Sequence, residues 1–304
     1  MNTIKYVLIT AAKNEESLIE KTIQSVLNQS ITPEKWIIVS DGSTDTTNDI
    51  VERYRNKIEF IDLIILPPKE ARNFSSKVNA LNTALKKSKA TEFDFIGNLD
   101  ADVTLEKNYY EEVFNRFLSN PKLGIAGGII LDCSDGKVYP QNISLNSVAG
   151  AIQIFRKECI EKIGYYLPFK FGGEDAYMEI MARMNGWDVQ TLTELKVYHH
   201  RRTGTSMGSL SLANLRSGKM FYTLGYSPIF ISVRCFYRFF NKPVLIGSLL
   251  NIVGYFTAYI QKEKCPAGDT FINFVRSEQK ERLKSFLPFK KKKHVVKTSR
   301  MIKI

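Results

Sequence analysis

The chain has 304 residues, of which 44% are hydrophobic and 24% are charged, and its formal net charge is +12. A chain of this length can bury a full core without disulfides or metals, and its composition excludes a disordered chain, a collagen and a coiled coil. The four cysteines are scattered without a Cys-x-x-Cys pair, which indicates a reduced compartment and argues against a zinc ribbon.

Strand-like and helix-like segments alternate over the first two-thirds of the chain. Runs that are apolar on both faces predict buried strands at residues 6–10, 36–40, 60–66, 93–99 and 123–131. Apolar residues at helical spacing predict helices over residues 18–27, 50–54, 78–85 and 113–118. The pattern predicts an α/β fold, with a mostly parallel sheet covered by helices on both faces. Ligands of such sheets bind at the carboxyl ends of the strands.

The character of the chain changes near residue 205. Residues 203–211 are rich in Gly, Ser and Thr and predict a mobile loop. Residues 243–261 carry no charge and approach the length of a transmembrane helix, but Pro, Gly and polar residues interrupt them and favour an interfacial segment. A buried helical pair that closes the domain is the alternative. We expect three parts: a domain at 1–205, a helical, membrane-associated segment at 206–283 and a basic tail at 284–304.

The basic tail holds eight Lys or Arg and no Asp or Glu. Such a tail attracts an anionic surface, either lipid or nucleic acid. A solvated tail without a partner is the alternative.

Two carboxylates, Asp100 and Asp102, directly follow the predicted strand at 93–99. Residues i and i+2 of an extended chain point the same way, so both carboxylates can face one hard cation. A divalent ion held in this way completes its shell with water and substrate phosphates. The ordinary alternative is a turn in which Asp102 caps a helix, and the two interpretations are compatible.

Acidic residues also follow two other segments. Asp41 and a glycine follow the strand at 36–40, where a carboxylate can accept the N–H of a nucleobase or bind a ribose hydroxyl, although Asp-Gly is also ordinary turn chemistry. Glu174 and Asp175 follow Gly172 and Gly173, whose freedom brings the acids close to a ligand. Such a carboxylate can remove a proton from a sugar hydroxyl, or the acids can simply favour the dipole of the following helix.

A basic cluster, His199-His200-Arg201-Arg202, ends the α/β part of the chain. Adjacent residues of a strand face opposite ways, so we expect at most one histidine to reach a metal. The two arginines can bind a diphosphate. A solvated basic loop is the alternative.

Five segments that occur in a fixed order carry a family resemblance, at residues 11–16, 39–45, 76–82, 100–102 and 173–175. Together they resemble the family 2 nucleotide-sugar glycosyltransferases, which have the GT-A Rossmann-like fold. The resemblance covers residues 4–202 and implies that the domain at 1–205 binds a nucleotide sugar and is catalytic.

The resemblance implies a role for each matching residue. The donor-binding positions are Ala11, Ala12 and Asp41 at the nucleobase, Glu15 near the ribose or base, Lys77 near the phosphates and Asp100 near the ribose, with Arg201 and Arg202 at the diphosphate. The metal positions are Asp102, Asp100 and His200, with His199 as the substitute if the strand register differs by one. Asp175 matches the general base of inverting members, and Glu174 helps to position the acceptor or the base.

The resemblance therefore implies an inverting glycosyltransferase that depends on Mn²⁺ or Mg²⁺. The family default is a UDP-sugar donor. Ser40 stands where many relatives have a second Asp, and the Gln-x-x-Arg-Trp motif of processive members is missing, which favours transfer of one sugar per acceptor.

The C-terminal segments add an expected setting. We expect a saccharide or lipid-linked acceptor, a role in cell-surface polysaccharide biosynthesis, an anionic membrane surface at the cytoplasmic face as partner, and no nucleic acid. The alternatives are transfer to a polyprenyl phosphate and a non-catalytic glycan- or nucleotide-binding module.

Overall fold

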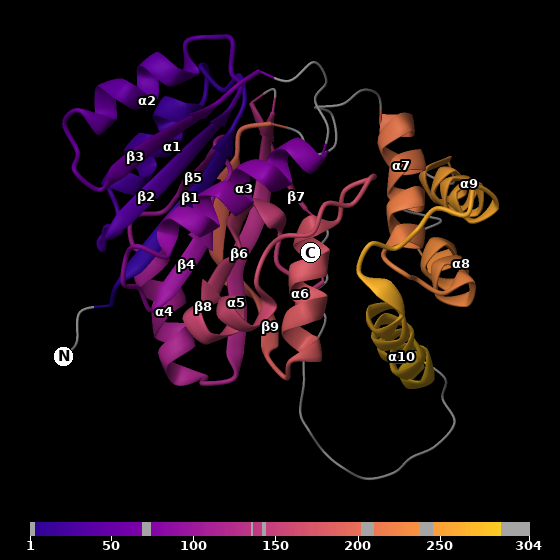
Figure 1. Ribbon diagram of the computed structural model, residues 1–304. Helices are drawn as coiled ribbons and strands as arrows, with labels where there is room; N and C mark the ends of the chain where they lie inside the picture. Colours follow the sequence, from indigo (N-terminus) through magenta and orange to yellow (C-terminus); the bar gives the residue numbers. More distant parts are fainter. Residues whose placement is uncertain are drawn as a thin grey trace.

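The computed structural model describes residues 4–68, 74–134, 136–141, 144–201, 210–237 and 246–286. Up to His199 the chain contains both strands and helices, and from Leu210 onward each described element is a helix (Figure 1). This confirms the α/β fold class. Arg202, the predicted loop up to residue 209 and the basic tail from residue 287 lie outside the described residues.

One mixed sheet forms the centre of the domain (Figure 1), and in the described part of the chain its strand order is β3-β2-β1-β4-β8-β6-β9-β5, with β7 on the edge of β6. The strands are β1 Tyr6–Ala12, β2 Lys35–Asp41, β3 Ile61–Leu66, β4 Phe95–Asn98, β5 Val103–Leu105, β6 Leu123–Ser134, β7 Lys137–Pro140, β8 Ile154–Arg156 and β9 Asp188–His199. The half from β3 to β4 is parallel, as the sequence predicts. Beyond it, β8 runs antiparallel to both β4 and β6, because this three-residue strand enters between them from the opposite end.

Helices cover both faces of the sheet. They are α1 Ile19–Leu27, α2 Thr47–Arg55, α3 Phe74–Ser88, α4 Tyr109–Ser119, α5 Lys157–Ile163 and α6 Glu174–Met184, with a 3₁₀ turn, η1, at Gly150–Ile152. The alternation of side chains along β1 divides the core in two. Tyr6 and Leu8 pack with residues of α1, α2 and α4, whereas Val7 and Ile9 pack with residues of α3, α5 and α6. The continuous apolar runs of the sequence are thus explained by burial on both faces.

The C-terminal helices form a separate layer beside α6 (Figure 1). They are α7 Leu210–Thr223, α8 Pro228–Tyr237, α9 Ile246–Ile260 and α10 Gly268–Phe286. Helices α7 and α9 pack at very close range, because a Cβ added to Gly218 would lie 2.0 Å from the Asn251 carbonyl oxygen and one added to Gly254 would lie 2.0 Å from that of Leu215. In the described ranges, no helix combines the length and the apolar character needed to cross a membrane.

Candidate active site

The carboxyl ends of three parallel strands bring the predicted donor residues to one edge of the sheet. Strand β1 ends with Ala11 and Ala12, which pair with Val39 and Ser40 of β2, and Asp41 is the last residue of β2. On its other side β1 pairs with β4, which leads directly into Asp100. The nucleobase and ribose positions implied by the resemblance therefore lie side by side.

Asp41 is buried at this edge and has one side-chain hydroxyl as a partner. Ser76 of α3 donates a short hydrogen bond to Asp41 Oδ2. The other oxygen, Oδ1, is buried and accepts no hydrogen bond from any described residue. A buried carboxylate oxygen of this kind is costly unless a ligand N–H or O–H satisfies it.

Lys77, also on α3, pairs with Asp100 across the end of β4. Its Nζ atom lies 3.0 Å from Asp100 Oδ1 and 3.3 Å from Oδ2. Burial lowers the pKa of Lys77, but the carboxylates of Asp100 and Glu174 outweigh it and raise the pKa above its usual value. Burial raises the pKa of Asp100, and Lys77 opposes this rise. The lysine therefore stays charged and brings one positive charge to the edge of the sheet.

Asp102 lies beside His199, the last residue of β9. His199 Nε2 is 3.3 Å from Asp102 Oδ2, and His199 Nδ1 is 2.9 Å from Asp132 Oδ1 on β6. Burial lowers the pKa of His199, but hydrogen bonds to the two carboxylates and their charges outweigh it and raise the pKa to about 9. Burial alone would raise the pKa of Asp102, but His199 and Arg201 lower it. Asp102 therefore stays ionised at neutral pH.

His200 lies on the other side of the chain from His199. The register pairs Val103 of β5 with His199, and the next residue turns away. The ring of His200 is 2.9 Å from Thr104 Oγ1, and it lines a separate hollow together with Lys21. The structure therefore places the ring of His199, rather than that of His200, beside Asp102.

Arg201 joins the beginning and the end of the domain. It forms a two-pronged ion pair with Glu15, with Nη1 2.8 Å from Oε1, and its Nε lies 3.9 Å from Asp102 Oδ2. Glu15 is buried and follows β1, and Thr47 Oγ1 accepts its backbone N–H at 2.7 Å. Two predicted donor residues are thus held against each other and against the predicted metal position.

A cavity of about 480 Å³ contains both the lysine pair and the acidic pair. Its charged and polar lining includes Lys77, Asn98, Asp100, Gln141, Ser147, Glu174, Asp175, His199, Arg216 and Ser217. Gly173 has a left-handed φ of 106°, which a side chain would strain, and this turn directs the first residues of α6 into the cavity. Glycine at position 173 therefore suits the left-handed backbone conformation that precedes α6.

Glu174 and Asp175 differ in their surroundings. Burial, and next the charge of Asp175, raise the pKa of Glu174 above its usual value. Glu174 Oε2 is buried and has no hydrogen-bond partner among the described residues. Asp175 Oδ1 accepts the N–H of Ala176 at 2.8 Å. Glu174 therefore holds its proton more tightly than an exposed carboxyl group does.

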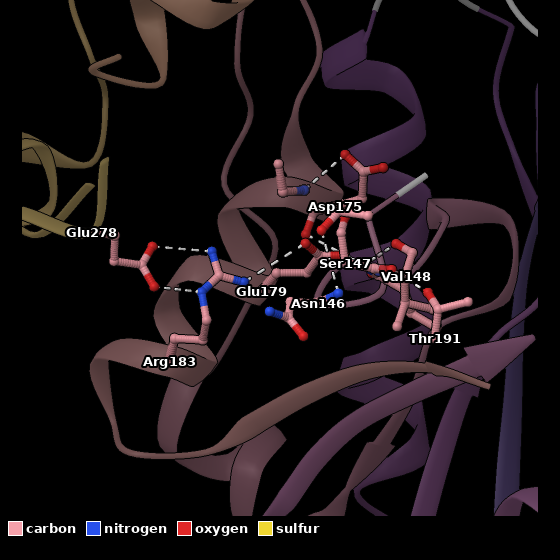
Figure 2. Close-up of polar contacts among 11 residues, drawn as sticks. Asn146, Ser147, Val148, Asp175, Glu179, Arg183, Thr191 and Glu278 are labelled. Carbon is pink, nitrogen blue, oxygen red and sulfur yellow. Dashed lines mark hydrogen bonds and ion pairs between the residues drawn. The ribbon is translucent and has the colours of Figure 1, made fainter. Parts of the chain in front are cut away.

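Three further residues of this region carry no sequence motif. Tyr166 lines the cavity with a buried hydroxyl that has no partner in the described part of the chain. Arg216 of α7 also lines the cavity. It is the first charged residue of that helix, and this position is a weak signal in the sequence for a role at the site. Glu179 lies behind Asp175 on α6, and Figure 2 shows it directed at Ser147 and Val148. Only the four-residue spacing from Asp175 could have indicated it.

Among the described residues, no group of three or more His, Cys, Asp or Glu side chains is arranged to hold a metal ion. The carboxylate of Asp102 and the imidazole of His199 still offer one oxygen and one nitrogen donor side by side. Mg²⁺ and related ions commonly take one or two protein ligands and complete their shell with phosphates and water. The donor set fits an ion of that kind and does not fit a closed structural site.

Two bacterial proteins match part of the chain in sequence. The chain is 26% identical over 179 residues to the poly-beta-1,6-N-acetyl-D-glucosamine synthase of Staphylococcus epidermidis, and the match covers 52% of this chain and 41% of that protein. The synthase of the same name from Staphylococcus aureus (strain COL) is 26% identical over 177 residues with the same coverage. The chain thus spans less than half the length of these relatives.

Solved structures match more of the chain at lower identity. TarS 1–349 of S. aureus has a TM-score of 0.54 and 17% identity, covering 86% of this chain and 73% of that one. Mannosyltransferase PcManGT from Pyrobaculum calidifontis, solved with GDP-Man and Mn²⁺, has a TM-score of 0.56 and 15% identity, covering 94% of this chain and 82% of that one. These likenesses establish the GT-A type of fold. The model of the family "Glycosyl transferase family 2" matches residues 7–180, more than half of the chain, and the chain belongs to this family of enzymes.

Proposed function

We propose that the protein is an inverting, metal-dependent glycosyltransferase that moves one sugar from a nucleoside diphosphate to an acceptor hydroxyl. One observation carries the proposal: a single cavity is lined both by Lys77 and Asp100 and by Glu174 and Asp175. A donor phosphate needs positive charge, and an acceptor hydroxyl needs a base, so the two halves of one transfer reaction are within reach of one bound sugar.

The edge of the sheet beside the cavity suits a nucleoside diphosphate. The unsatisfied Oδ1 of Asp41 can accept a nucleobase N–H. Lys77 and Arg201 bring positive charge toward the diphosphate, and Asp100 can accept a ribose hydroxyl. Neighbours of the same fold were solved with UDP-GlcNAc and with GDP-Man, which supports a nucleotide sugar as donor. We retain a UDP-sugar as the first candidate.

Asp102 and His199 would hold the metal ion. Because metal binding needs a neutral imidazole, the proton of His199 would leave when the ion binds. The ion would neutralise charge on the leaving diphosphate. The positive charges of Lys77 and Arg201 would stabilise the same negative charge on the leaving diphosphate.

Asp175 serves as the base. Its carboxylate accepts the proton of the acceptor hydroxyl while that oxygen attacks the anomeric carbon from the face opposite the diphosphate, which inverts the configuration. Glu174, whose pKa is raised mainly by burial, can remain protonated and donate a hydrogen bond that orients the acceptor. The buried hydroxyl of Tyr166 can donate to an oxygen of the bound sugar.

A surface of α9 supports an acceptor at a membrane. Five apolar residues at spacings of three and four are between 41% and 76% exposed, namely Ile246, Leu249, Val253, Phe256 and Ile260. The opposite side of α9 packs on α7 through Gly254. A helix that is apolar on both sides must bury the second apolar side away from water. An interfacial helix buries that side in the lipid headgroup layer. The basic residues 287–304 add attraction to an anionic bilayer. A lipid-linked saccharide at the cytoplasmic face is the acceptor that this surface favours.

Titration calorimetry with UDP-N-acetylglucosamine, other UDP-sugars, GDP-mannose and dTDP-glucose, each with and without Mn²⁺, tests the proposal. We expect one donor class to bind in a Mn²⁺-dependent manner, and Asp102→Ala to abolish that dependence. A folded wild type that binds none of these donors would contradict the enzyme and favour a binding module. A donor-binding enzyme in which Asp175→Asn retains most of its turnover with a phosphate acceptor would favour transfer to a polyprenyl phosphate.

A further inference from the structure

Three charged residues share one face of α6, behind the cavity. Asp175, Glu179 and Arg183 follow one another at intervals of four residues, so their side chains lie in one row along the helix. Figure 2 shows the row, with Glu179 in the middle. Arg183 Nη1 lies 3.9 Å from Glu179 Oε2, and Arg183 Nε lies 2.8 Å from Glu278 Oε1 on α10.

Glu179 binds the segment that forms the opposite wall of the cavity. Its Oε1 atom accepts the backbone N–H of Val148 at 2.6 Å, the hydroxyl of Ser147 at 3.2 Å and the side-chain amide of Gln153 at 3.4 Å. The same amide of Gln153 also lies 3.4 Å from the carbonyl oxygen of Asp175. One buried carboxyl group therefore joins the wall to the helix that carries the predicted base.

The wall packs directly on the carboxylate of Asp175. A Cβ added to Gly150 would lie 2.7 Å from Asp175 Oδ2, so the backbone at Gly150 touches this oxygen. The residues from Ser147 to Ala151 all line the cavity. Any movement of this wall changes the space in front of Asp175.

We propose that Glu179 is a positioning residue that holds the wall at 147–150 against Asp175 and so fixes the base with respect to the acceptor. The inference rests on the proposed transferase function. Asp41, Lys77 and Asp102 lie on other elements, and their side chains pair with Ser76, Asp100 and His199 rather than with the wall, so we expect donor binding to depend on this anchor less than the base does.

The cost of the arrangement supports a functional role. Glu179 is 4% exposed, and an apolar side chain would be cheaper to bury there. Burial, and next the charge of Asp175, raise its pKa to about 8, while Arg183 acts in the opposite direction. The hydroxyl of Tyr226 is another titratable group that interacts with it. Glu179 is therefore a neutral acid at neutral pH, and glutamine is its closest substitute.

Hydrogen exchange and kinetics on the full chain test the inference with Glu179→Ala, Glu179→Gln and, as a matched control, Glu278→Gln. Glu278→Gln removes the carboxylate that pairs with Arg183 and leaves the hydrogen bond between Glu179 and Val148 in place. The donor is UDP-N-acetylglucosamine or GDP-mannose, whichever the wild type binds, and its hydrolysis gives the turnover. Exchange in the peptide over 145–151 measures the anchor itself.

We expect Glu179→Ala to accelerate exchange over 145–151 and to lower kcat by at least about 10-fold, with the dissociation constant of the donor within about 3-fold of wild type. Glu179→Gln should restore the wild-type exchange rate and kcat, and Glu278→Gln should leave the exchange rate and kcat unchanged. Unchanged exchange in Glu179→Ala, unchanged kcat despite faster exchange, or failure of Glu179→Gln to restore either would overturn the inference. A wild type that binds no nucleotide sugar would instead refute the proposed function, and the exchange data would still decide whether Glu179 anchors the wall.

Discussion

His199 Nε2 lies 3.3 Å from Asp102 Oδ2, whereas the ring of His200 lies 2.9 Å from Thr104 Oγ1. Of two adjacent histidines, the structure thus directs one to the acidic edge of the sheet. Asp132 of β6 is paired with His199 in the sheet and lies 2.9 Å from its Nδ1 atom, which helps to hold the ring of His199 at this edge.

The first prediction concerns these two histidines. His199→Ala should weaken Mn²⁺ binding in the presence of a nucleoside diphosphate by at least about 10-fold, because it removes the donor atom beside Asp102. His200→Ala is the matched control and should change the affinity by less than about 2-fold, because its ring points away. Electron paramagnetic resonance titration of free Mn²⁺ measures both. The opposite ranking would return the metal position to His200.

The second prediction concerns two tyrosines with buried hydroxyls that lack partners among the described residues, Tyr166 and Tyr110. Removing such a hydroxyl removes its desolvation cost, so Tyr166→Phe and Tyr110→Phe should each raise the free energy of unfolding by about 1 kcal/mol. Only Tyr166 lines the cavity. Chemical denaturation measures stability, and donor hydrolysis measures turnover. Tyr166→Phe should lower turnover several-fold and Tyr110→Phe should not, so equal turnover in the two variants would exclude the sugar contact.

The third prediction is a pH dependence of stability. The pKa of Glu179 is raised to about 8 in the folded chain, so between its ordinary value and pH 8 the folded state keeps a proton that the unfolded state releases. The free energy of unfolding therefore falls as pH rises through this window. Glutamine cannot ionise, so Glu179→Gln should gain stability relative to wild type from pH 5 to pH 8, by up to roughly 4 kcal/mol. A difference that is constant with pH in urea denaturation would show that Glu179 titrates normally.

The fourth prediction concerns the apolar stripe of α9. The double variant Leu249→Glu, Val253→Glu should lose most of its binding to vesicles of anionic lipid in a flotation assay, because it places two charges in the predicted contact. Leu118 is 62% exposed on α4, so Leu118→Glu is a matched control that should float like wild type. A wild type that stays with the soluble fraction, or a control that is equally impaired, would exclude this surface as the membrane contact.

Much of the parallel half of the fold follows from apolar runs that are bounded by helices. The runs of β1 and β2 are buried, and that of β3 is partly exposed at the edge of the sheet. The strands β5 and β8 have three residues each and give no periodic signal, so their antiparallel pairing could not be predicted. The acidic positions Asp41, Asp100 and Glu174 could be located because each follows a strand or a glycine turn. Glu179 could not, since its role arises from a contact with Val148 that joins segments 31 residues apart.

The stereochemical outcome of turnover tests the central claim most directly. Proton NMR can follow the sugar released from the bound donor in the first minutes, before mutarotation, with Asp175→Asn beside the wild type. We expect the wild type to release the anomer opposite to that of the donor, and Asp175→Asn to bind the donor normally but to turn over at least about 100-fold more slowly. Release of the retained anomer, or wild-type turnover in Asp175→Asn, would contradict inverting transfer with Asp175 as the base.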